Sequence, residues 1–397
     1  MSAERASPAV PALLRFAEHA DPRVLVPAFG LTLIGLVSLA STKPELVATQ
    51  VSGIVVGAAA ALALVLLPYR TVMRLAWPAW ICAILLLVLV WVPGIGVSAK
   101  GASRWIRFGS VQIQPSEFAK AAQVLLLARY VRFRDDHRTA KGLVMPFLLT
   151  IVPFLLVAAE PDLGSAMILV PTLFAMLWVA GARTRHLVAV VVMGVVSLPV
   201  LYGVLADYQR QRVDAYVHEL RESVGLAAPR PATLTREEQI AETIRKRRLR
   251  DSKLQTERAE VAVASGGVLG LGWGDGPMNV SNRVPEDWTD FIFVVHAEEW
   301  GFAGVTALFA AYLLFFFGLT SLAQETREPA ARMLCVGALV SLGAQTCLNL
   351  MMTLHLAPVT GVPLPFLTYG RSSMVSAWLL TGLAMHARAR APRVFTR

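Results

Sequence analysis

Cysteine and charged residues are scarce in this sequence. The 397-residue chain has three cysteines, Cys82, Cys335 and Cys347, and all of them lie in apolar stretches. This placement argues against a disulfide framework and against a thiolate metal site. Charged residues make up only 16% of the chain and hydrophobic residues 55%, with a mean hydropathy of +0.57. Such a composition excludes an ordinary soluble domain of this length and predicts a multi-pass membrane protein.

Apolar runs long enough to cross a bilayer, about 17–25 residues each, recur along the chain. We identify ten of them, at 24–41, 48–67, 76–93, 115–131, 145–160, 163–181, 187–205, 290–317, 332–354 and 373–387. The predicted fold is therefore an all-α polytopic membrane protein with about ten transmembrane helices. We expect no signal peptide, because no small-residue cleavage site follows the first apolar run.

Basic residues near the span ends predict the orientation, since Lys and Arg in short loops are retained in the cytoplasm. One set of loops is rich in arginine, and the short loops of the opposite set contain only Lys43, Lys100, Arg104, Arg107 and Arg371. We expect both termini in the cytoplasm and the outer face to carry 94–114, 206–289 and 355–372. Residues 1–397 then form one membrane domain, in which 206–289 is a large extracytoplasmic loop between spans seven and eight. This bias explains the net charge of +10 without a nucleic-acid partner.

Two outer segments contain polar groups that lipid would not tolerate without a purpose. The first, GASRWIRFGSVQIQPSEFAK, ends with Glu117 and Lys120 on one helix face, three residues apart. They form either a structural ion pair or part of a cavity lining. Trp105 alone is typical of an interfacial aromatic belt. The second, EPDLGSA, places Asp162 where it can cap the next helix, face a cavity, or do both.

A third segment, PEDWTDFIFVVHAE, places Asp290 at the start of an apolar run and Glu298 about 12 Å deeper at 1.5 Å rise per residue. Capping by Thr289 or Asp290 is the simpler explanation of the first carboxylate. It does not explain Glu298 and Glu299, because each buried carboxylate costs several kcal/mol unless it is paired or wet. We therefore expect a water-filled cavity under Asp290.

Two further outer segments have unusual backbones. Ser265–Gly276, SGGVLGLGWGDG, predicts a tight loop whose backbone approaches another chain segment closely, and it does not match a phosphate-binding loop. Leu356–Ser373, LAPVTGVPLPFLTYGRSS, contains three prolines that prevent a regular helix. We expect it to be a re-entrant wall of the same cavity, with a plain connecting loop as the alternative.

Taken together, these segments resemble the shape, elongation, division and sporulation (SEDS) family of RodA and FtsW type, the membrane-embedded polymerases of peptidoglycan. The motifs GASRWI, QPSEFAK, EPDLGSA, YQRQRV, ASGGVLG, TDFIF with AEEWGF, and PVTGVPLPFLTYG follow the family's order over nearly the whole chain. The wording PVTGVPLPF is closer to the RodA elongation branch. The chain departs from the family pattern at Trp288, His355 and Arg371.

The resemblance implies an inverting glycosyltransferase that joins lipid II into glycan strands for cell elongation or shape, on the outer face of the bacterial cytoplasmic (inner) membrane. Asp290 matches the family's essential aspartate and would act as general base. The residues implied for substrate binding are Arg104, Trp105, Gln114, Ser116, Glu117, Lys120, Asp162, Arg212, Ser265, Gly266, Glu298, Thr360, Pro363, Pro365, Ser372 and Ser373.

The resemblance also implies a stimulating divalent cation, Mg²⁺ or Mn²⁺, for which the sequence offers no dedicated ligands, and no organic cofactor. The implied partner is a class B penicillin-binding protein, a single-span transpeptidase. Two alternatives remain open from the sequence. One is a transporter that flips lipid II, and the other is a catalytically degenerate scaffold for a transpeptidase.

Overall fold

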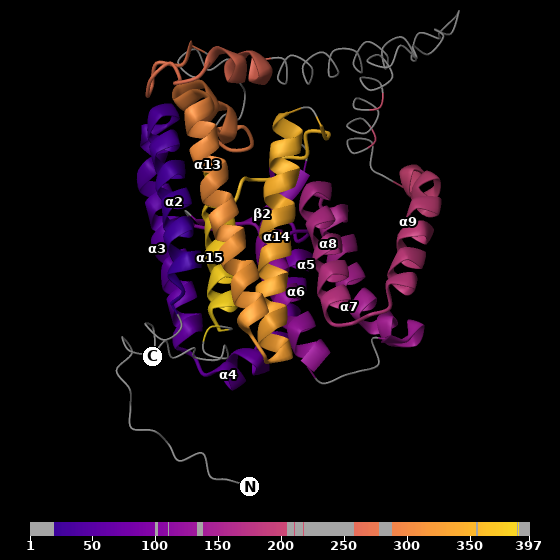
Figure 1. Ribbon diagram of the computed structural model, residues 1–397. Coiled ribbons are helices and arrows are strands. Elements are labelled where there is room, and N and C mark those ends of the chain that lie inside the picture. The colour runs from indigo at the N-terminus through magenta and orange to yellow at the C-terminus, as the bar shows by residue number, and fades with distance from the viewer. Residues whose placement is uncertain are drawn as a thin grey trace, which may run out of the picture.

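The computed structural model describes residues 20–99, 102–109, 111–132, 138–204, 210, 217, 258–277, 288–354, 356–386 and 388. Helices dominate these residues (Figure 1). They are α2 (Pro22–Thr42), α3 (Pro44–Leu66), α4 (Tyr69–Arg74), α5 (Ala76–Leu89), α6 (Pro115–Arg132), α7 (Ala140–Ala159), α8 (Leu163–Val179), α9 (Thr184–Val204), α13 (Ile292–Glu325), α14 (Pro329–Thr353) and α15 (Arg371–Met385).

Each predicted span contains one helix, which confirms the predicted fold class of a helical multi-pass membrane protein. By length and composition α2, α3, α7, α13 and α14 can each cross a membrane, and shorter apolar helices lie at 76–89, 163–179 and 184–197. Helices α6 and α15 carry more polar side chains, and most of their residues are buried. Protein rather than lipid surrounds these two helices, and polar groups on them such as Lys120 and Ser376 bind partners within the bundle.

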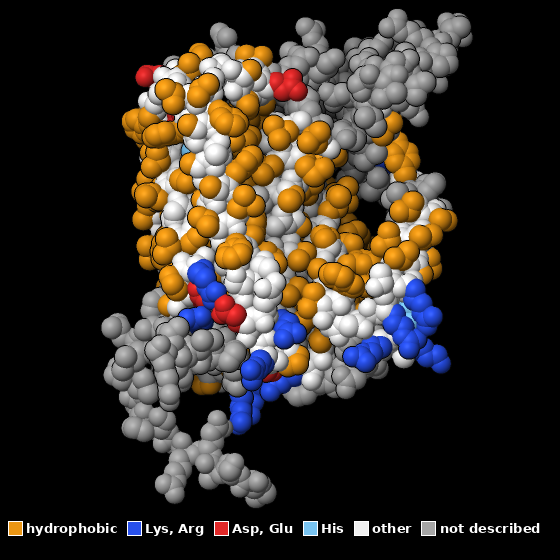
Figure 2. All heavy atoms as spheres, in the orientation of Figure 1, with side chains coloured by type: hydrophobic (Ala, Val, Ile, Leu, Met, Phe, Trp, Pro, Cys, Tyr) orange, Lys and Arg blue, Asp and Glu red, His pale blue; other side chains and the backbone are white. Residues whose placement is uncertain are grey.

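Charge divides the surface of the bundle into two ends. Figure 2 shows apolar side chains over the sides and Lys and Arg gathered at one end, which we call the basic end. There Arg23 Nη1 lies 2.5 Å from Glu325 Oε1, and Arg388 Nη1 lies 3.3 Å from Asp21 Oδ2. These ion pairs bring the start of α2, the end of α13 and the residues after α15 together. The opposite end, which we call the motif end, contains residues 43, 96–99, 102–109, 111–113, 160–162, 258–277 and 288–291.

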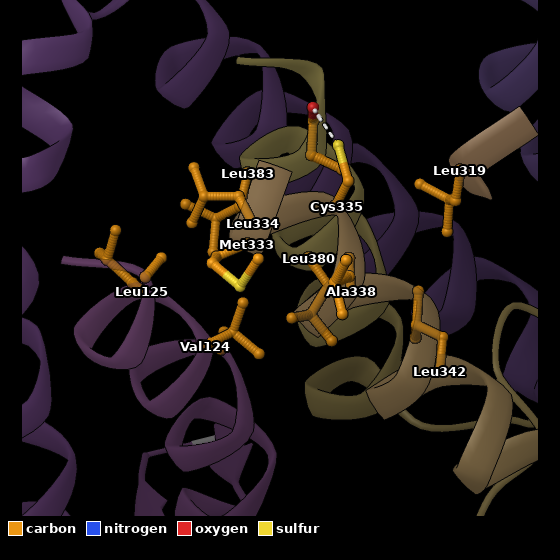
Figure 3. Close-up of a cluster of buried hydrophobic side chains, with 14 of the residues drawn as sticks. Val124, Leu125, Leu319, Met333, Leu334, Cys335, Ala338, Leu342, Leu380 and Leu383 are labelled. Atoms are coloured by element: carbon orange, nitrogen blue, oxygen red, sulfur yellow. Dashed lines mark hydrogen bonds between the residues drawn. The ribbon is translucent and has the colours of Figure 1, made fainter. Parts of the chain in front are cut away.

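The core lies where α6, α13, α14 and α15 meet. Figure 3 shows this cluster, in which Val124 and Leu125 of α6 gather with Met333 and Leu334 of α14. The Cys335 thiol is buried there and donates to the carbonyl of Ala384, so it acts as a small core residue. Elsewhere small residues allow helices to approach closely, which is the usual way that helices pack in lipid. A Cβ atom added at Gly382 of α15 would lie 2.8 Å from Ala61 Cα of α3.

A small antiparallel sheet, which the sequence did not indicate, lies between α5 and α6. Its strands are β1 (Gly96–Ala99), β2 (Ala102–Phe108) and β3 (Val111–Ile113), in the order β1-β2-β3. Trp105 pairs with Val97, and Arg107 pairs with Gln112. Strands this short give little period-two pattern in a sequence. Strand β3 leads directly into Gln114 and the start of α6, so the sheet anchors the entry to that helix.

Helix α13 is not straight. Gly301 has φ 59° and ψ −160°, which breaks the helix between a short outer part and a long part from 302 to 325. The long part alone spans about 36 Å at 1.5 Å per residue, which is enough for a bilayer core of about 30 Å. Asp290 precedes the helix, which begins at Ile292. The stretch from Asp290 to Glu298 is therefore helical only from Ile292 onward, and the predicted depth of Glu298 below Asp290 stays a prediction.

Candidate functional site

Asp290 lies half-buried in the turn that precedes α13. Its backbone carbonyl accepts a hydrogen bond from Asn349 Nδ2 of α14 at 3.0 Å. Its carboxylate lies beside Gly361, because a Cβ atom added there would be 3.2 Å from Asp290 Oδ2. Gly361 also has φ 72°, a conformation that favours glycine. Glycine therefore lets the backbone at position 361 lie close to the Asp290 carboxylate, where a side chain would be crowded and strained.

Residues 356–370, which we call the re-entrant segment, enter the bundle from the motif end. The carbonyl of Pro365 at the tip accepts from Tyr312 Oη of α13 at 2.5 Å. A Cβ atom added at Gly35 of α2 would lie 2.6 Å from Leu367 Cα. Gly35 lies seven residues before the end of α2 at Thr42, so the tip reaches about 10 Å into the bundle. This depth agrees with the predicted re-entrant wall.

Amide side chains from the helices satisfy the irregular backbone of the re-entrant segment. Gln50 of α3 donates from Nε2 to the Thr368 carbonyl and accepts from the Gly370 N–H, both at 3.0 Å. The Gln50 side chain is buried, so water does not compete for these bonds. The bonds fix the segment where it leaves the bundle and starts α15.

Two amides on α14 bind the same segment closer to Asp290. Gln345 Nε2 donates to the Pro363 carbonyl at 2.8 Å, and Asn349 Nδ2 donates to the Val362 carbonyl at 2.7 Å. We did not predict these residues or Gln50 as parts of the site. The signal was present, because amide side chains are costly inside apolar spans and often mark functional positions.

Asp162 organises a second polar group at the start of α8. Its Oδ1 accepts from the Ser165 N–H at 3.3 Å, which confirms that it caps the helix. Its Oδ2 accepts from Gln114 Nε2 at 3.0 Å and from Ser116 Oγ at 3.1 Å. Arg104 Nη1 lies 3.9 Å from Oδ1. The cap is therefore also the centre of a polar cluster built from β2, α6 and α8.

This cluster is connected to the start of α15. The backbone N–H of Gln114 donates to Ser372 Oγ at 3.0 Å, and Ser373 is buried beside it in the sequence. Arg104 also donates to the carbonyl of Pro161, which precedes Asp162. The predicted residues of the segments GASRWIRFGSVQIQPSEFAK, EPDLGSA and Leu356–Ser373 therefore do meet in space.

Glu117 and Lys120 form the predicted ion pair, 2.9 Å between Nζ and Oε1, with both side chains 1% exposed. Lys120 Nζ also donates to Gln345 Oε1 at 2.6 Å, and Gln345 in turn holds the Pro363 carbonyl. The Glu117 carbonyl accepts from Ser376 Oγ at 2.7 Å. The pair thus joins α6 to α14, to α15 and to the re-entrant segment.

Glu160, in the turn between α7 and α8, is buried and has no hydrogen-bond partner for either carboxylate oxygen among the described residues. Burial and the nearby Asp162 carboxylate raise the pKa of Glu160 to about 9, against an opposing effect of Arg104. At neutral pH this carboxyl group is therefore protonated, and it adds no charge beside Asp162.

The glycine-rich loop packs against the break in α13. A Cβ atom added at Gly266 would lie 2.1 Å from the Ala297 carbonyl oxygen, which confirms the predicted close approach of two backbones. The Leu271 N–H donates to the Glu298 carbonyl at 3.1 Å, and the Phe302 N–H donates to the Gly267 carbonyl at 2.9 Å. The loop thereby satisfies backbone groups that the break at Gly301 removes from the helix.

Three predicted site residues belong to this loop-and-helix junction rather than to the Asp162 cluster. Gly266 faces Ala297, and the Ser265 hydroxyl donates to the Ala262 carbonyl at 2.7 Å. A Cβ atom added at Gly276 would lie 2.5 Å from Glu298 Oε2, so this carboxylate packs against the loop. The loop therefore covers the Glu298 side chain, and this contact is enough to explain why Glu298 is buried.

The re-entrant segment lies between Asp290 and the Asp162 cluster. A Cβ atom added at Gly164, in the first turn of α8, would lie 2.4 Å from Val362 and 2.9 Å from Thr360. Gly361, between them, approaches the Asp290 carboxylate. Residues 360–362 therefore separate the two carboxylates. Arg212, His355 and the charged stretch 218–253 of the loop between spans seven and eight lie outside the described residues.

Two further features bear on cofactors and ligands. Among the described residues, no three His, Cys, Asp or Glu side chains gather to hold a metal ion. A cavity of about 330 Å³ lies between α2, α3 and α15 and is lined almost wholly by apolar side chains, including Phe29 and Leu62. It contains none of the predicted site residues. The water-filled cavity expected under Asp290 stays a prediction.

The chain is similar in sequence and in structure to known proteins. The family model of the cell cycle proteins FtsW, RodA and SpoVE matches residues 24–392. The probable peptidoglycan glycosyltransferase FtsW of Geobacter sulfurreducens strain DL-1/KN400 is 32% identical over 326 residues, 81% of this chain and 79% of the relative. The peptidoglycan glycosyltransferase MrdB of Escherichia coli K12 is 29% identical over 371 residues, 92% and 93%. A solved chain of a peptidoglycan synthase complex that coordinates polymerization and crosslinking matches with TM-score 0.73 and 28% identity, over 93% of this chain and 97% of that one.

Proposed function

The chain belongs to the family of cell cycle proteins that includes FtsW, RodA and SpoVE, and from this premise we propose that it is a peptidoglycan glycosyltransferase. Its substrate is lipid II, which it polymerises into glycan strands for cell elongation or shape. The observation that carries the proposal is the half-buried Asp290 carboxylate at the motif end, which lies against the re-entrant segment, with the Asp162 cluster on the other side of that segment. Relatives named as peptidoglycan glycosyltransferases support the reaction class.

Asp290 is the proposed general base. The attacking sugar hydroxyl transfers its proton to the carboxylate as its oxygen bonds to the anomeric carbon of the donor. The bond from that carbon to the diphosphate oxygen breaks, and the diphosphate leaves with the electron pair. One displacement inverts the anomeric centre, so no second carboxylate is needed as nucleophile.

The surrounding residues have different proposed roles. Arg104 is partly exposed, so it can oppose the negative charge of the diphosphate. Lys120 is fully buried and paired with Glu117, so it acts by holding Gln345 and the re-entrant segment. Asp162 aligns Gln114 and Ser116 for the sugar or the diphosphate. The proposed role of Arg212 in substrate binding rests only on the resemblance to the family.

The orientation follows from the charge distribution. Lys and Arg gather at the basic end (Figure 2), so that end is proposed to face the cytoplasm and the motif end the outside. Both termini then lie in the cytoplasm of a bacterial cell, and the reaction takes place at the outer face of the cytoplasmic membrane.

A class B penicillin-binding protein is the proposed partner. Its support is the similarity to a chain of a synthase complex that coordinates polymerization with crosslinking. A divalent cation, Mg²⁺ or Mn²⁺, is proposed to act from the substrate side. Mg²⁺ usually binds through one or two carboxylates plus substrate phosphates. This mode suits a site whose described residues contain no cluster of three ligating side chains.

The test is polymerisation of fluorescent lipid II by the purified chain, alone and with its transpeptidase, followed by gel analysis of the glycan strands. Asp290→Asn keeps the shape of the side chain and removes the base, so strands should be lost. Asp275→Asn, in the exposed part of the glycine-rich loop, is the matched control and should polymerise normally. Equal product from Asp290→Asn and the unaltered chain would refute the role of Asp290.

A further inference from the structure

Asn349 joins two parts of the site that are distant in the sequence. Its Nδ2 donates to the Asp290 carbonyl at 3.0 Å and to the Val362 carbonyl at 2.7 Å. An amide nitrogen carries two hydrogens, so both donors are used. Because both neighbours are acceptors, they also decide which way the amide group points. Leu at this position has no donor, and an ionised Asp has none either.

Burial makes these two bonds strong constraints. Asn349 is 0% exposed, so no water replaces a lost bond. A buried carbonyl left without a donor is costly, which keeps both carbonyls at hydrogen-bond distance from one nitrogen atom. The backbone of Asp290 is therefore tied to the re-entrant segment at Val362, next to the residue that approaches its carboxylate.

Asn349 does not act alone on α14. Gln345 lies one turn earlier on the same helix face and holds the next carbonyl, that of Pro363. Gln345 is itself held by Lys120 of the buried ion pair. A continuous path of hydrogen bonds thus leads from Glu117 through α14 to the backbone of the re-entrant segment, and Asn349 is the member that extends it to Asp290.

The neighbours of Asp290 in this turn are also held, since Phe291 is buried in a cluster with Ala259, Ala262 and Val294. Phe291 caps α13 without a side-chain hydrogen bond. The Trp288 carbonyl accepts from the Tyr369 N–H at 3.1 Å, and Lys43 Nζ lies 4.8 Å from the centre of the Trp288 ring. The contacts of Trp288 act two residues away, whereas Asn349 bonds to Asp290 itself.

We infer that Asn349 is a positioning residue that sets the place of the Asp290 carboxylate relative to the re-entrant segment. This inference rests on the proposed function, in which Asp290 accepts the proton. A general base works only within hydrogen-bond reach of the hydroxyl, and a displacement of about 1 Å can cost about 10²-fold in rate. Asn349 should therefore affect turnover more than substrate affinity.

The experiment compares two variants of the full chain with a matched control. Asn349→Leu keeps about the size of the side chain and removes both donors, and Asn349→Asp replaces the two N–H donors by a carboxyl group that can donate at most one hydrogen bond, when protonated. Thr346→Val is the control, because the Thr346 hydroxyl bonds only the Leu342 carbonyl of its own helix. Each protein is purified, checked for a single monodisperse species and a thermal transition, and assayed with fluorescent lipid II across a range of pH.

For Asn349→Asp and Asn349→Leu, we expect kcat per folded molecule to fall about 10- to 100-fold with KM within about twofold of the unaltered chain. The acid limb of the pH profile, which reports ionisation of the base, should also move. Thr346→Val should match the unaltered chain in all three readouts. A folded Asn349 variant with unaltered kcat overturns the inference. It is also overturned if the activity falls only in proportion to the fraction of unfolded protein and the pH profile does not move.

An Asp290→Asn sample separates failure of this inference from failure of the proposed function. If Asp290→Asn is inactive and both Asn349 variants are fully active, only the positioning role falls. If Asp290→Asn polymerises like the unaltered chain, the base assignment falls, and the positioning role falls with it.

Discussion

The two ends of the bundle hold charged side chains in opposite ways. The basic end contains two acids, Asp21 and Glu325, that pair with two bases, Arg23 and Arg388. The Arg23 and Glu325 side chains are 36% and 39% exposed. At the motif end Glu117 and Lys120 are almost fully buried, and their bonds continue through Gln345 into the backbone of the re-entrant segment.

This difference separates a structural cluster from a functional one. The Arg23–Glu325 pair is partly exposed, so it costs little to form and contributes little. The Asp21 carboxylate is buried, but it lies beside both Arg23 and Arg388, and this cluster holds helix ends together. Burying an ion pair is expensive, and an apolar replacement of both partners is often equally stable. Stability alone therefore does not account for the charges at the motif end, whereas their connection to the backbone around Asp290 does.

The largest expected effect concerns the buried ion pair. Lys120→Met leaves the Glu117 carboxylate buried without its cation, which should lower the free energy of unfolding by about 3–5 kcal/mol. Thermal unfolding in detergent micelles measures this change. The double variant Glu117→Gln with Lys120→Met should recover most of the loss. Equal destabilisation in the single and double variants would contradict a cost due to unpaired charge.

The next effect concerns the junction between the glycine-rich loop and α13. In Gly301→Ala the residue keeps φ near 59° and its new Cβ atom would lie 2.3 Å from the Gly270 N, so we expect a loss of at least about 1–3 kcal/mol. Limited proteolysis should then cut within 258–277 at a higher rate. Gly30→Ala, on α2 where nothing lies within 4 Å, is the control and should be stabilising by up to about 1 kcal/mol. Unchanged proteolysis of Gly301→Ala would argue against the junction.

A smaller effect concerns Glu160 and pH. Between its ordinary pKa of 4.5 and the raised value of about 9, the folded chain keeps a proton that the unfolded chain has lost. Stability therefore falls as pH rises through this window. Glu160→Gln removes the titrating group, so its melting temperature should change less between pH 6 and 9 and exceed that of the unaltered chain at pH 8.5. Parallel pH curves for the two proteins would contradict a protonated Glu160.

The smallest effect is expected at the basic end. Arg23→Met removes the partly exposed pair with Glu325 and leaves Arg388 Nη1 3.3 Å from the buried Asp21 carboxylate, so it should cost at most about 1 kcal/mol, with a smaller cost at high salt. Thermal melting at low and high ionic strength measures it. A loss of several kcal/mol would remove the distinction between the two ends.

The sequence predicted the helices better than it predicted the site. Each of the ten apolar runs contains a helix among the described residues, and the spacing of Glu117 and Lys120 predicted their ion pair, because these patterns are local. The partners of Gln50, Gln345 and Asn349 come from segments far apart in the chain, so nothing near them in sequence indicates which carbonyls they bind. The break at Gly301 was missed for the same reason, since only the glycine-rich loop, about 30 residues earlier in the chain, makes it stable.

The most direct test of the central claim compares one variant from each end in the same lipid II polymerisation assay. Removing a general base typically costs 10²–10⁴-fold, so Asp290→Asn should lose at least about 100-fold in rate while its melting temperature stays close to that of the unaltered chain. Arg23→Met should polymerise at the unaltered rate. Full activity of Asp290→Asn, or an equal loss in both variants, would contradict the account.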